Sequence, residues 1–229
     1  AIGFGTLTDN TTGANNTALG LNSLANNTTA NSNTAVGTNS LVANTTGADN
    51  VAVGRNAYDA NTTGHSGVAI GESSLTTNTT GLRNVAVGQN CMAVNTTGAE
   101  NVAMGRNALD ANTTASNNVA IGDSALTLAT TAAKNTAIGS GAGASVTTGG
   151  FNVLVGIDSG DTLTTGDTNI LIGNTARPSA SGGANQISMG VVVTCVGDDN
   201  FTFGNQGTDS NIAFGATSIT APSDIRLKE

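Results

Sequence analysis

The feature that most constrains this chain is a glycine that returns every 17 residues. Each of these glycines closes a segment of the form Asn-x-Ala-x-Gly or a close variant, such as residues 50–54. A fixed period of this kind is the sequence signature of a solenoid, in which every repeat forms one coil and contacts its two neighbours. The recurring glycines are Gly3, Gly20, Gly37, Gly54, Gly71, Gly88, Gly105, Gly122, Gly139, Gly156, Gly173 and Gly190.

The segment before each glycine alternates a large apolar residue with alanine, as in Val51, Ala52 and Val53. Alternation with β-branched residues favours a short strand. The glycine then opens a turn, because it adopts positive φ without a Cβ clash. We expect a second strand after this turn, in which a small residue precedes a large one, as in Ala108 and Leu109.

An Asn-Thr-Thr-Gly sequence follows, as at residues 44–47 and 61–64, and it predicts a turn because Asn and Gly tolerate left-handed backbone. The fold class is therefore all-β, a parallel β-solenoid whose 17-residue coils each hold two short strands and two turns. Stacking in register places valine on valine and asparagine on asparagine, and stacked asparagines can hydrogen-bond to one another in a ladder. We interpret these asparagines as structural.

The alanines of the first strand, such as Ala86 and Ala103, pose the question of which side of the strand is buried. We expect the valines and isoleucines to fill the coil, which leaves a stripe of alanine on its surface. Such a stripe suits close packing against copies of the same chain, and three stripes around an axis give a homotrimer, either intertwined or side by side. The alternative is that the alanines fill a tight core within one monomer.

Composition argues against several partners. The net charge is −8 and no basic cluster is present, so no nucleic acid is expected as a partner. No apolar run is long enough for membrane insertion. The two cysteines, Cys91 and Cys195, lie about six coils apart, which excludes a disulfide within a straight solenoid.

No cofactor and no metal site is expected. His65 stands alone in a turn, without a second histidine to complete a metal site or a catalytic triad. Asp59 and Asp110 occupy equivalent places three coils apart, too distant for the carboxylate pair of a glycosidase. The chain is therefore not expected to be an enzyme, apart from the self-cleavage described below.

The repeat changes towards the C-terminus. The strand alanine becomes Leu154 and Leu171, and the large residue after the glycine becomes Gly143 and Gly160. Side-chain volume has therefore moved from one wall of the coil to the other. Beyond Gly190 the glycine spacing shortens to 14 and then 11 residues, and this part contains Phe201, Phe203 and Phe214.

Three segments follow from this pattern. Residues 1–190 form the regular β-solenoid, and residues 191–215 form shorter, tapering coils with an aromatic cap. Residues 216–229 form a linker and the start of a C-terminal motif. Because the chain begins within a repeat, we expect it to be a fragment or a processed product.

The segments 50–54 and 118–122 resemble the head repeats of trimeric autotransporter adhesins. Those heads are left-handed parallel β-rolls that assemble as trimers, so the resemblance implies a left-handed roll and a homotrimer. The adhesin repeat is usually somewhat shorter than the repeat in this chain.

The sequence Ser-Asp-Ile-Arg-Leu-Lys-Glu at residues 223–229 resembles the opening of the self-cleaving intramolecular chaperone of phage tail fibres and tailspikes, the endosialidase type. That family trimerises through its chaperone and then cuts it off. The resemblance implies cleavage of the bond Ser223–Asp224, with Ser223 as nucleophile and Lys228 as the assisting base. The chaperone body is not part of this chain, so we expect no self-cleavage by the chain as given.

These observations favour a structural function. The leading hypothesis is the shaft or head of a trimeric phage tail fibre in the virion, with a host cell-surface glycan or protein receptor and other tail proteins as partners. The alternative is the head of a trimeric adhesin on a bacterial cell surface. A minor alternative is an ice-binding solenoid, because paired threonines, from Thr11 and Thr12 to Thr164 and Thr165, recur in ten coils.

Overall fold

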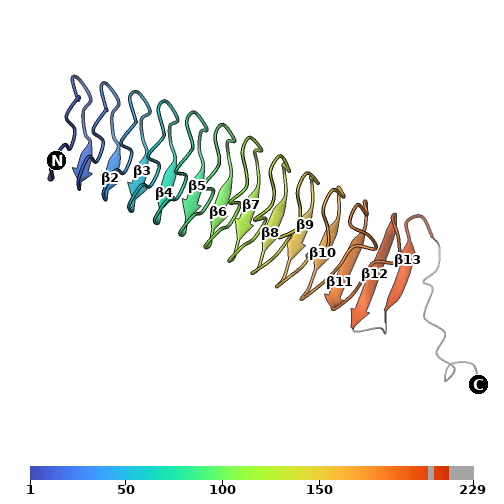
Figure 1. The fold of residues 1–229 in the computed structure, drawn as a ribbon. Coiled ribbons are helices and arrows are strands. Elements are labelled where there is room, and N and C mark those ends of the chain that lie inside the picture. Colours follow the sequence, from blue (N-terminus) through green and yellow to red (C-terminus); the bar gives the residue numbers. More distant parts are fainter. Residues whose placement is uncertain (206–208, 217–229) are drawn as a thin grey trace, which may run out of the picture.

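The computed structural model describes residues 1–205 and 209–216 and shows a β-solenoid of stacked coils (Figure 1). Successive coils lie side by side along one axis, and the strands run across that axis. The parallel β-solenoid predicted from the glycine spacing is confirmed. Among the described residues, none lies in a helix, so none forms a helix that could cross a membrane.

One strand from each coil contributes to a single sheet, in which the strands follow one another in chain order. The first ten strands have three residues each and the last three are longer. They are β1 (Thr17–Leu19), β2 (Thr34–Val36), β3 (Val51–Val53), β4 (Val68–Ile70), β5 (Val85–Val87), β6 (Val102–Met104), β7 (Val119–Ile121), β8 (Thr136–Ile138), β9 (Val153–Val155), β10 (Ile170–Ile172), β11 (Ile187–Val191), β12 (Asn200–Asn205) and β13 (Ser210–Ala213).

The strands from β1 to β12 pair in parallel and in the predicted register. Val51 lies on Val68, for example. The closing glycine is needed because adjacent coils approach closely there and its backbone adopts positive φ. Gly54 has a φ of 139°, and a Cβ at this position would lie 2.5 Å from the carbonyl oxygen of Gly71. The 17-residue spacing is therefore the spacing of these backbone contacts.

The second strand that we expected in each coil is not formed in the described residues, and this prediction is wrong. The residues after the glycine form turns with two left-handed positions, such as Asn56 and Tyr58, both with a φ of 56°. Their backbone groups still bond between coils, since the Leu41 N–H donates to the Ala57 carbonyl at 3.1 Å. A large residue pays a steric cost in left-handed backbone, so its sequence pattern does not indicate this conformation.

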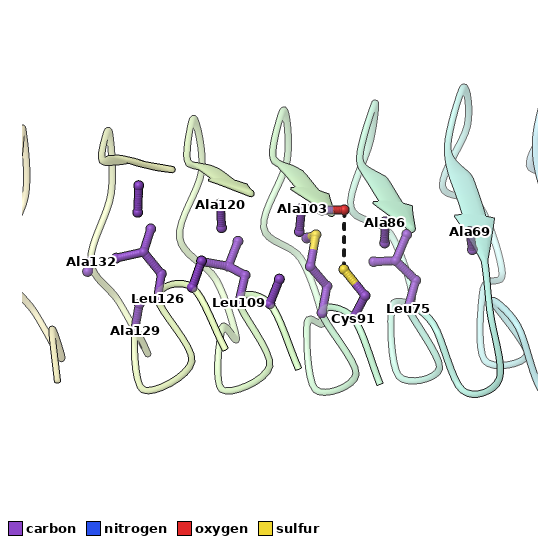
Figure 2. Packing of buried hydrophobic residues seen from close by; sticks show 14 of the residues in the cluster. Ala69, Leu75, Ala86, Cys91, Ala103, Leu109, Ala120, Leu126, Ala129 and Ala132 are labelled. Carbon is purple, nitrogen blue, oxygen red and sulfur yellow. Dashed lines mark hydrogen bonds between the residues drawn. The ribbon is translucent and has the colours of Figure 1, made fainter. Parts of the chain in front are cut away.

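The alanines of the strands lie inside the coils, so the expectation of an alanine stripe on the surface is wrong. Ala86 and Ala103 are 0% exposed, and the side chains of Leu75 and Leu109 pack beneath the strand alanines (Figure 2). The large side chain spans the narrow interior and leaves room for only a methyl group on the strand. The alternative, in which alanine fills a tight core within one chain, is correct.

Two ladders of buried asparagine run along the axis and confirm the structural interpretation of these residues. In the first, the Asn50 N–H donates to Oδ1 of Asn33 at 2.9 Å, and Asn50 Nδ2 donates to the Gly64 carbonyl at 2.9 Å. The same position holds Asn16, Asn33, Asn50, Asn84, Asn101, Asn118, Asn135, Asn152 and Asn169.

The second ladder joins the turns. Asn44 Nδ2 donates to Oδ1 of Asn27 at 3.0 Å and to the Gly47 carbonyl at 2.9 Å. This ladder ends at Asn112, because Ala129 occupies the equivalent place in the next coil. Oδ1 of Asn112 is consequently buried without a hydrogen-bond partner among the described residues.

The exchange of volume beyond residue 125 is confirmed. A Cβ at Gly143 would lie 2.6 Å from Cδ1 of Leu154, so the leucine on the strand occupies the space of the missing side chain. Val146 and Leu163, both fully buried, replace the asparagine of the second ladder. The C-terminal coils therefore have apolar side chains in place of the second asparagine ladder, while the first ladder continues to Asn169.

The last coils depart from the regular pattern. β12 lies parallel on β11 after the shorter 14-residue interval, with Phe201 on Ile187. β13 runs antiparallel to β12, so residues 210–213 form a hairpin strand where we expected a further shortened coil. Phe201 and Phe203 pack with ring centroids 5.0 Å apart.

One coil carries a tyrosine in the core. The Tyr58 hydroxyl donates to the Gly81 carbonyl at 3.3 Å and accepts from Nδ2 of Asn78 at 3.2 Å, which leaves Oδ1 of Asn61 without a partner in the described part of the chain. Gly67 replaces an asparagine of the first ladder, and a Cβ there would lie 2.6 Å from the tyrosine hydroxyl. The Tyr58 ring therefore occupies the space that an asparagine side chain at position 67 would otherwise fill.

This pair yields a test of the core. Gly67→Asn alone should destabilise the coil through a clash with the ring, and Tyr58→Leu alone should leave a void. The double variant restores the combination found at Leu109 and Asn118, so its coupling free energy should be favourable by about 1–3 kcal/mol. Denaturant unfolding of the four proteins measures this coupling, and strictly additive effects would contradict the shared volume.

Candidate functional site: the outer strand face

The residues on either side of each strand alanine point out of the solenoid. We call this surface the outer strand face. Its first column contains Thr17, Thr34, Val51, Val68, Val85, Val102, Val119, Thr136, Val153, Ile170 and Ile187. Its second column contains Leu19, Val36, Val53, Ile70, Val87, Met104, Ile121, Ile138, Val155, Ile172 and Met189.

The second column is apolar in every coil from β1 to β11. Ile70, Met104 and Met189 expose 39%, 41% and 42% of their surface, whereas the intervening alanines are buried. Monomeric soluble proteins rarely expose a continuous apolar surface that extends along the whole molecule, and such surfaces mark sites of association.

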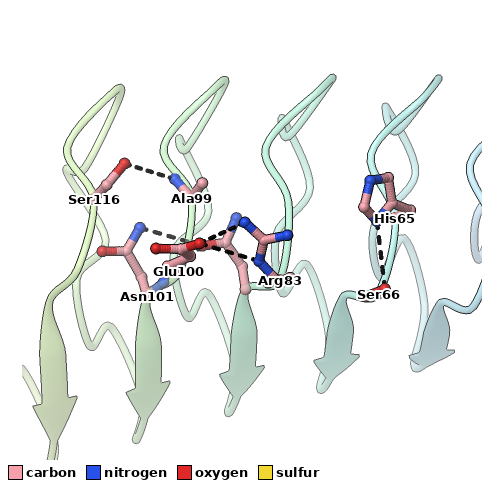
Figure 3. A network of polar contacts seen from close by, with 8 residues as sticks. His65, Ser66, Arg83, Ala99, Glu100, Asn101 and Ser116 are labelled. Carbon is pink, nitrogen blue, oxygen red and sulfur yellow. Dashed lines mark hydrogen bonds and ion pairs between the residues drawn. The ribbon is translucent and has the colours of Figure 1, made fainter.

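Charged residues flank this face. Arg83 lies just before β5 and pairs with Glu100 of the next coil, with Nε 3.1 Å from the carboxylate (Figure 3). Beyond the other end of the strands, Arg106 pairs with Asp123, its Nε 2.9 Å from Oδ1. Arg55 pairs with Glu72 in the same way as Arg106 with Asp123, and Lys134 Nζ lies 4.7 Å from the ring centroid of Phe151.

The paired threonines form two columns with different environments. The first of each pair is tied into the solenoid, since Thr28 Oγ1 donates to the Thr45 carbonyl at 3.1 Å and the contact repeats in successive coils. The second is exposed throughout. This exposed column consists of Thr12, Thr29, Thr46, Thr63, Thr80, Thr97, Thr114, Thr131, Thr148 and Thr165.

The other candidate residues are placed apart from one another. His65 is exposed, and its Nδ1 lies 3.4 Å from Ser66 Oγ (Figure 3). Asp59 accepts a hydrogen bond from Thr76 Oγ1 at 2.7 Å, and burial raises the pKa of Asp110 above its ordinary value. Within residues 1–205 and 209–216, no pocket is found and no three His, Cys, Asp or Glu side chains gather as metal ligands.

Ser223, Asp224 and Lys228 lie outside the described residues, so the predicted cleavage site has no structural description. The outer strand face was present in the sequence as an alternating pattern, but we assigned its valines to the core. The signal that could have placed it correctly is the large residue that follows each glycine, because that residue already fills the interior.

The fold and its surface define the class of protein as a parallel β-solenoid repeat protein with an apolar outer face. Neither known protein families, nor characterised proteins, nor solved structures give a match to this chain.

Substitutions on the two sides of the strand should have opposite consequences. Val53→Lys with Val87→Lys should leave the solenoid folded, because these side chains point outwards, but should block association through the outer strand face. Ala86→Asp should unfold the coil at a cost of several kcal/mol, because it buries a charge without a partner. Circular dichroism and sedimentation velocity separate the two effects, and equal loss of structure in both variants would contradict the assignment of the faces.

The cysteines provide a second check on the core. Burial raises the pKa of Cys91 to about 12 and that of Cys195 to about 11, so both thiols are neutral in the folded protein. A maleimide should label them only as the protein unfolds. The stabilisation from the neutral Cys91 thiol is complete below its ordinary pKa of 9.0 and is lost as the pH rises towards 12.

The variant Cys91→Ala should therefore weaken the fall in stability between pH 9 and pH 12, because alanine occupies this place at Ala57 and Ala108. Urea unfolding at several pH values measures the difference between the two proteins. An identical pH profile would show that the thiol does not titrate on unfolding.

Proposed function

We propose that this protein is a structural fibre segment that assembles as a homotrimer through the outer strand face and serves attachment to a surface. The observation that carries the proposal is the unbroken apolar column from Leu19 to Met189. Burial of this column between chains removes it from water along the full length of the solenoid.

Three copies suit this face because it is narrow. The strands from β1 to β10 have only three residues, and charged residues lie beyond both ends in the middle coils. Three such faces around an axis bury the apolar columns in the centre and leave the charged flanks at the rims between neighbours. This arrangement replaces the alanine stripe as the basis of the trimer.

Within this proposal, the leading assignment is the shaft or head of a phage tail fibre. It is supported by the resemblance of residues 223–229 to the start of a self-cleaving chaperone. Ser223 then acts as nucleophile and Lys228 as base in the precursor, and the cut at Ser223–Asp224 releases the chaperone after assembly. Host cell-surface receptors and other tail proteins are the partners expected for such a fibre.

The head of a bacterial trimeric adhesin is the alternative, and it uses the same face for assembly. The two assignments differ in what surrounds this segment in its full-length protein. A self-cleaving C-terminal chaperone supports the tail fibre, and a secretion signal with a membrane anchor supports the adhesin.

The exposed threonine column favours ice binding as a minor alternative. Its members recur once in each coil and lie at the surface from Thr12 to Thr165. However, each is the outer member of a pair in a turn, where the inner hydroxyl bonds to the next coil. A thermal hysteresis clearly above that of a control protein would favour this alternative.

Expression of a full-length precursor tests the proposal. We expect a trimer by native mass spectrometry, and cleavage after Ser223 if the precursor carries the chaperone. Ser223→Ala should leave the precursor uncut but still trimeric, because the chaperone acts in assembly before the cut. A stable monomer would overturn the proposed assembly, and cleavage of the Ser223→Ala precursor would overturn the assigned nucleophile.

A further inference from the structure

A longer period is superimposed on the 17-residue repeat. Residues 49–60 and 100–111 are nearly identical, and they are separated by 51 residues, or three coils. Asp49 and Arg55 in the first segment correspond to Glu100 and Arg106 in the second. The residues that repeat with this longer period include the charged residues beside the outer strand face.

These residues form two columns. The start flank lies five residues before the closing glycine and contains Asp49, Ser66, Arg83, Glu100, Asn117 and Lys134 in successive coils. The end flank lies one residue after the glycine and contains Arg55, Glu72, Gln89, Arg106, Asp123 and Ser140. Each coil therefore contributes one residue to each flank, and the charged residues lie at defined heights along the solenoid axis.

Rotation about an axis parallel to the solenoid brings the start flank of one copy against the end flank of the next. Six residues separate Asp49 from Arg55, and eleven separate Glu72 from Arg83. At roughly 4.8 Å per 17-residue coil, the corresponding side chains on neighbouring copies differ in height by only about 1.7 and 3.1 Å. No shift along the axis is needed to bring them together.

The charges then alternate along the whole seam. The cross-chain neighbours are Asp49 with Arg55, Glu72 with Arg83, Glu100 with Arg106, and Asp123 with Lys134. The pairs Arg55–Glu72, Arg83–Glu100 and Arg106–Asp123 already exist within each chain. Pairs within a chain alternate with pairs between chains, so every charged group between Asp49 and Lys134 lies between two groups of opposite charge.

Beyond the charged residues, the two flanks continue with apolar side chains. Three coils beyond Glu100 and Arg106, the equivalent places hold Phe151 and Ile157, which expose 58% and 55% of their surface. Two large apolar side chains therefore replace the charged pair, and both members change together. This joint change is expected if the two positions meet across an interface.

Other arrangements lose this match. A shift of one coil in the unfavourable direction places Glu72 beside Asp49, Arg106 beside Arg83, and Asp123 beside Glu100, so that like charges meet at the three closest charged contacts. An antiparallel pair centred on the coil closed by Gly105 sets Glu100 against Glu100 and Arg106 against Arg106.

We propose that copies of this chain associate in parallel and without axial shift, and that the alternating seam from Asp49 to Lys134 fixes this register. The occupant of the outer strand face is thus a second copy of the same chain with the same direction. This proposal rests on the self-association proposed above and adds its polarity, register and contacting residues.

Cysteine cross-linking tests the polarity. The variant carrying both Glu100→Cys and Arg106→Cys should give covalent dimers and trimers with a short bis-maleimide, because each cysteine meets the other type on a neighbour. Either single variant should give almost none. The combination of Arg55→Cys with Glu100→Cys is the matched control, since these residues lie three coils apart. Dimers from the Glu100→Cys variant alone would overturn the parallel arrangement.

Charge reversal tests the register. Asp49→Lys with Glu100→Lys should weaken association by roughly tenfold or more, because two opposite-charge contacts become like-charge contacts. Further substitution of Arg55→Glu and Arg106→Glu should restore association, although it creates like-charge neighbours within each chain. The same added charge at Thr46, Thr63, Thr80 and Thr97, all changed to Lys, should have little effect.

The outcomes separate the two proposals. If the parent chain stays monomeric in sedimentation and native mass spectrometry, the proposed self-association fails. If it assembles, but the four-residue charge exchange fails to rescue the weakened variant, only the charged seam fails.

Discussion

The structure depends on the buried asparagine amide that bonds from one coil to the next. In the first ladder the side-chain oxygen of Asn33 accepts from the backbone of Asn50, and the amide of Asn50 in turn binds the Gly64 carbonyl. A buried amide that loses a partner costs about 1–3 kcal/mol. Since most coils repeat these contacts, a one-residue insertion breaks several at once, and this keeps the 17-residue period fixed.

The narrow coil explains the surface. The asparagines and the large side chain after each glycine occupy the interior, so the strand contributes only a methyl group there. The valines and isoleucines on its other side then have no place within the chain. The apolar outer strand face is therefore a consequence of the core, and the proposed assembly would bury it against a second copy.

The sequence predicted the register of the strands correctly but not which face of each strand points into the coil. The glycine spacing requires equivalent residues to stack. The sequence also indicated that the larger side chain of Leu154 compensates for the missing side chain at Gly143, so that the total volume inside the coil changes little. Alternation in a strand distinguishes two faces but does not say which one is inside. The left-handed conformation of Tyr58 and its equivalents depends on contacts with neighbouring coils, and propensity argues against it. The valines of the site were thus identified and assigned to the wrong side.

The ion pairs along the flanks are poorly explained by stability within one chain. The side chains of Arg55 and Arg106 are both 61% exposed, and exposed pairs contribute up to about 1 kcal/mol each. The ladders and the core already fix the coils without them. Their sign alternates along each flank and recurs after three coils, which is the order that a matching surface on a second copy needs in the proposed assembly. Apolar contact is non-directional and supplies affinity, whereas charge order supplies direction and register. The two columns of the outer strand face vary little from one coil to the next, so in the proposed assembly the flanks carry the information that the apolar face lacks.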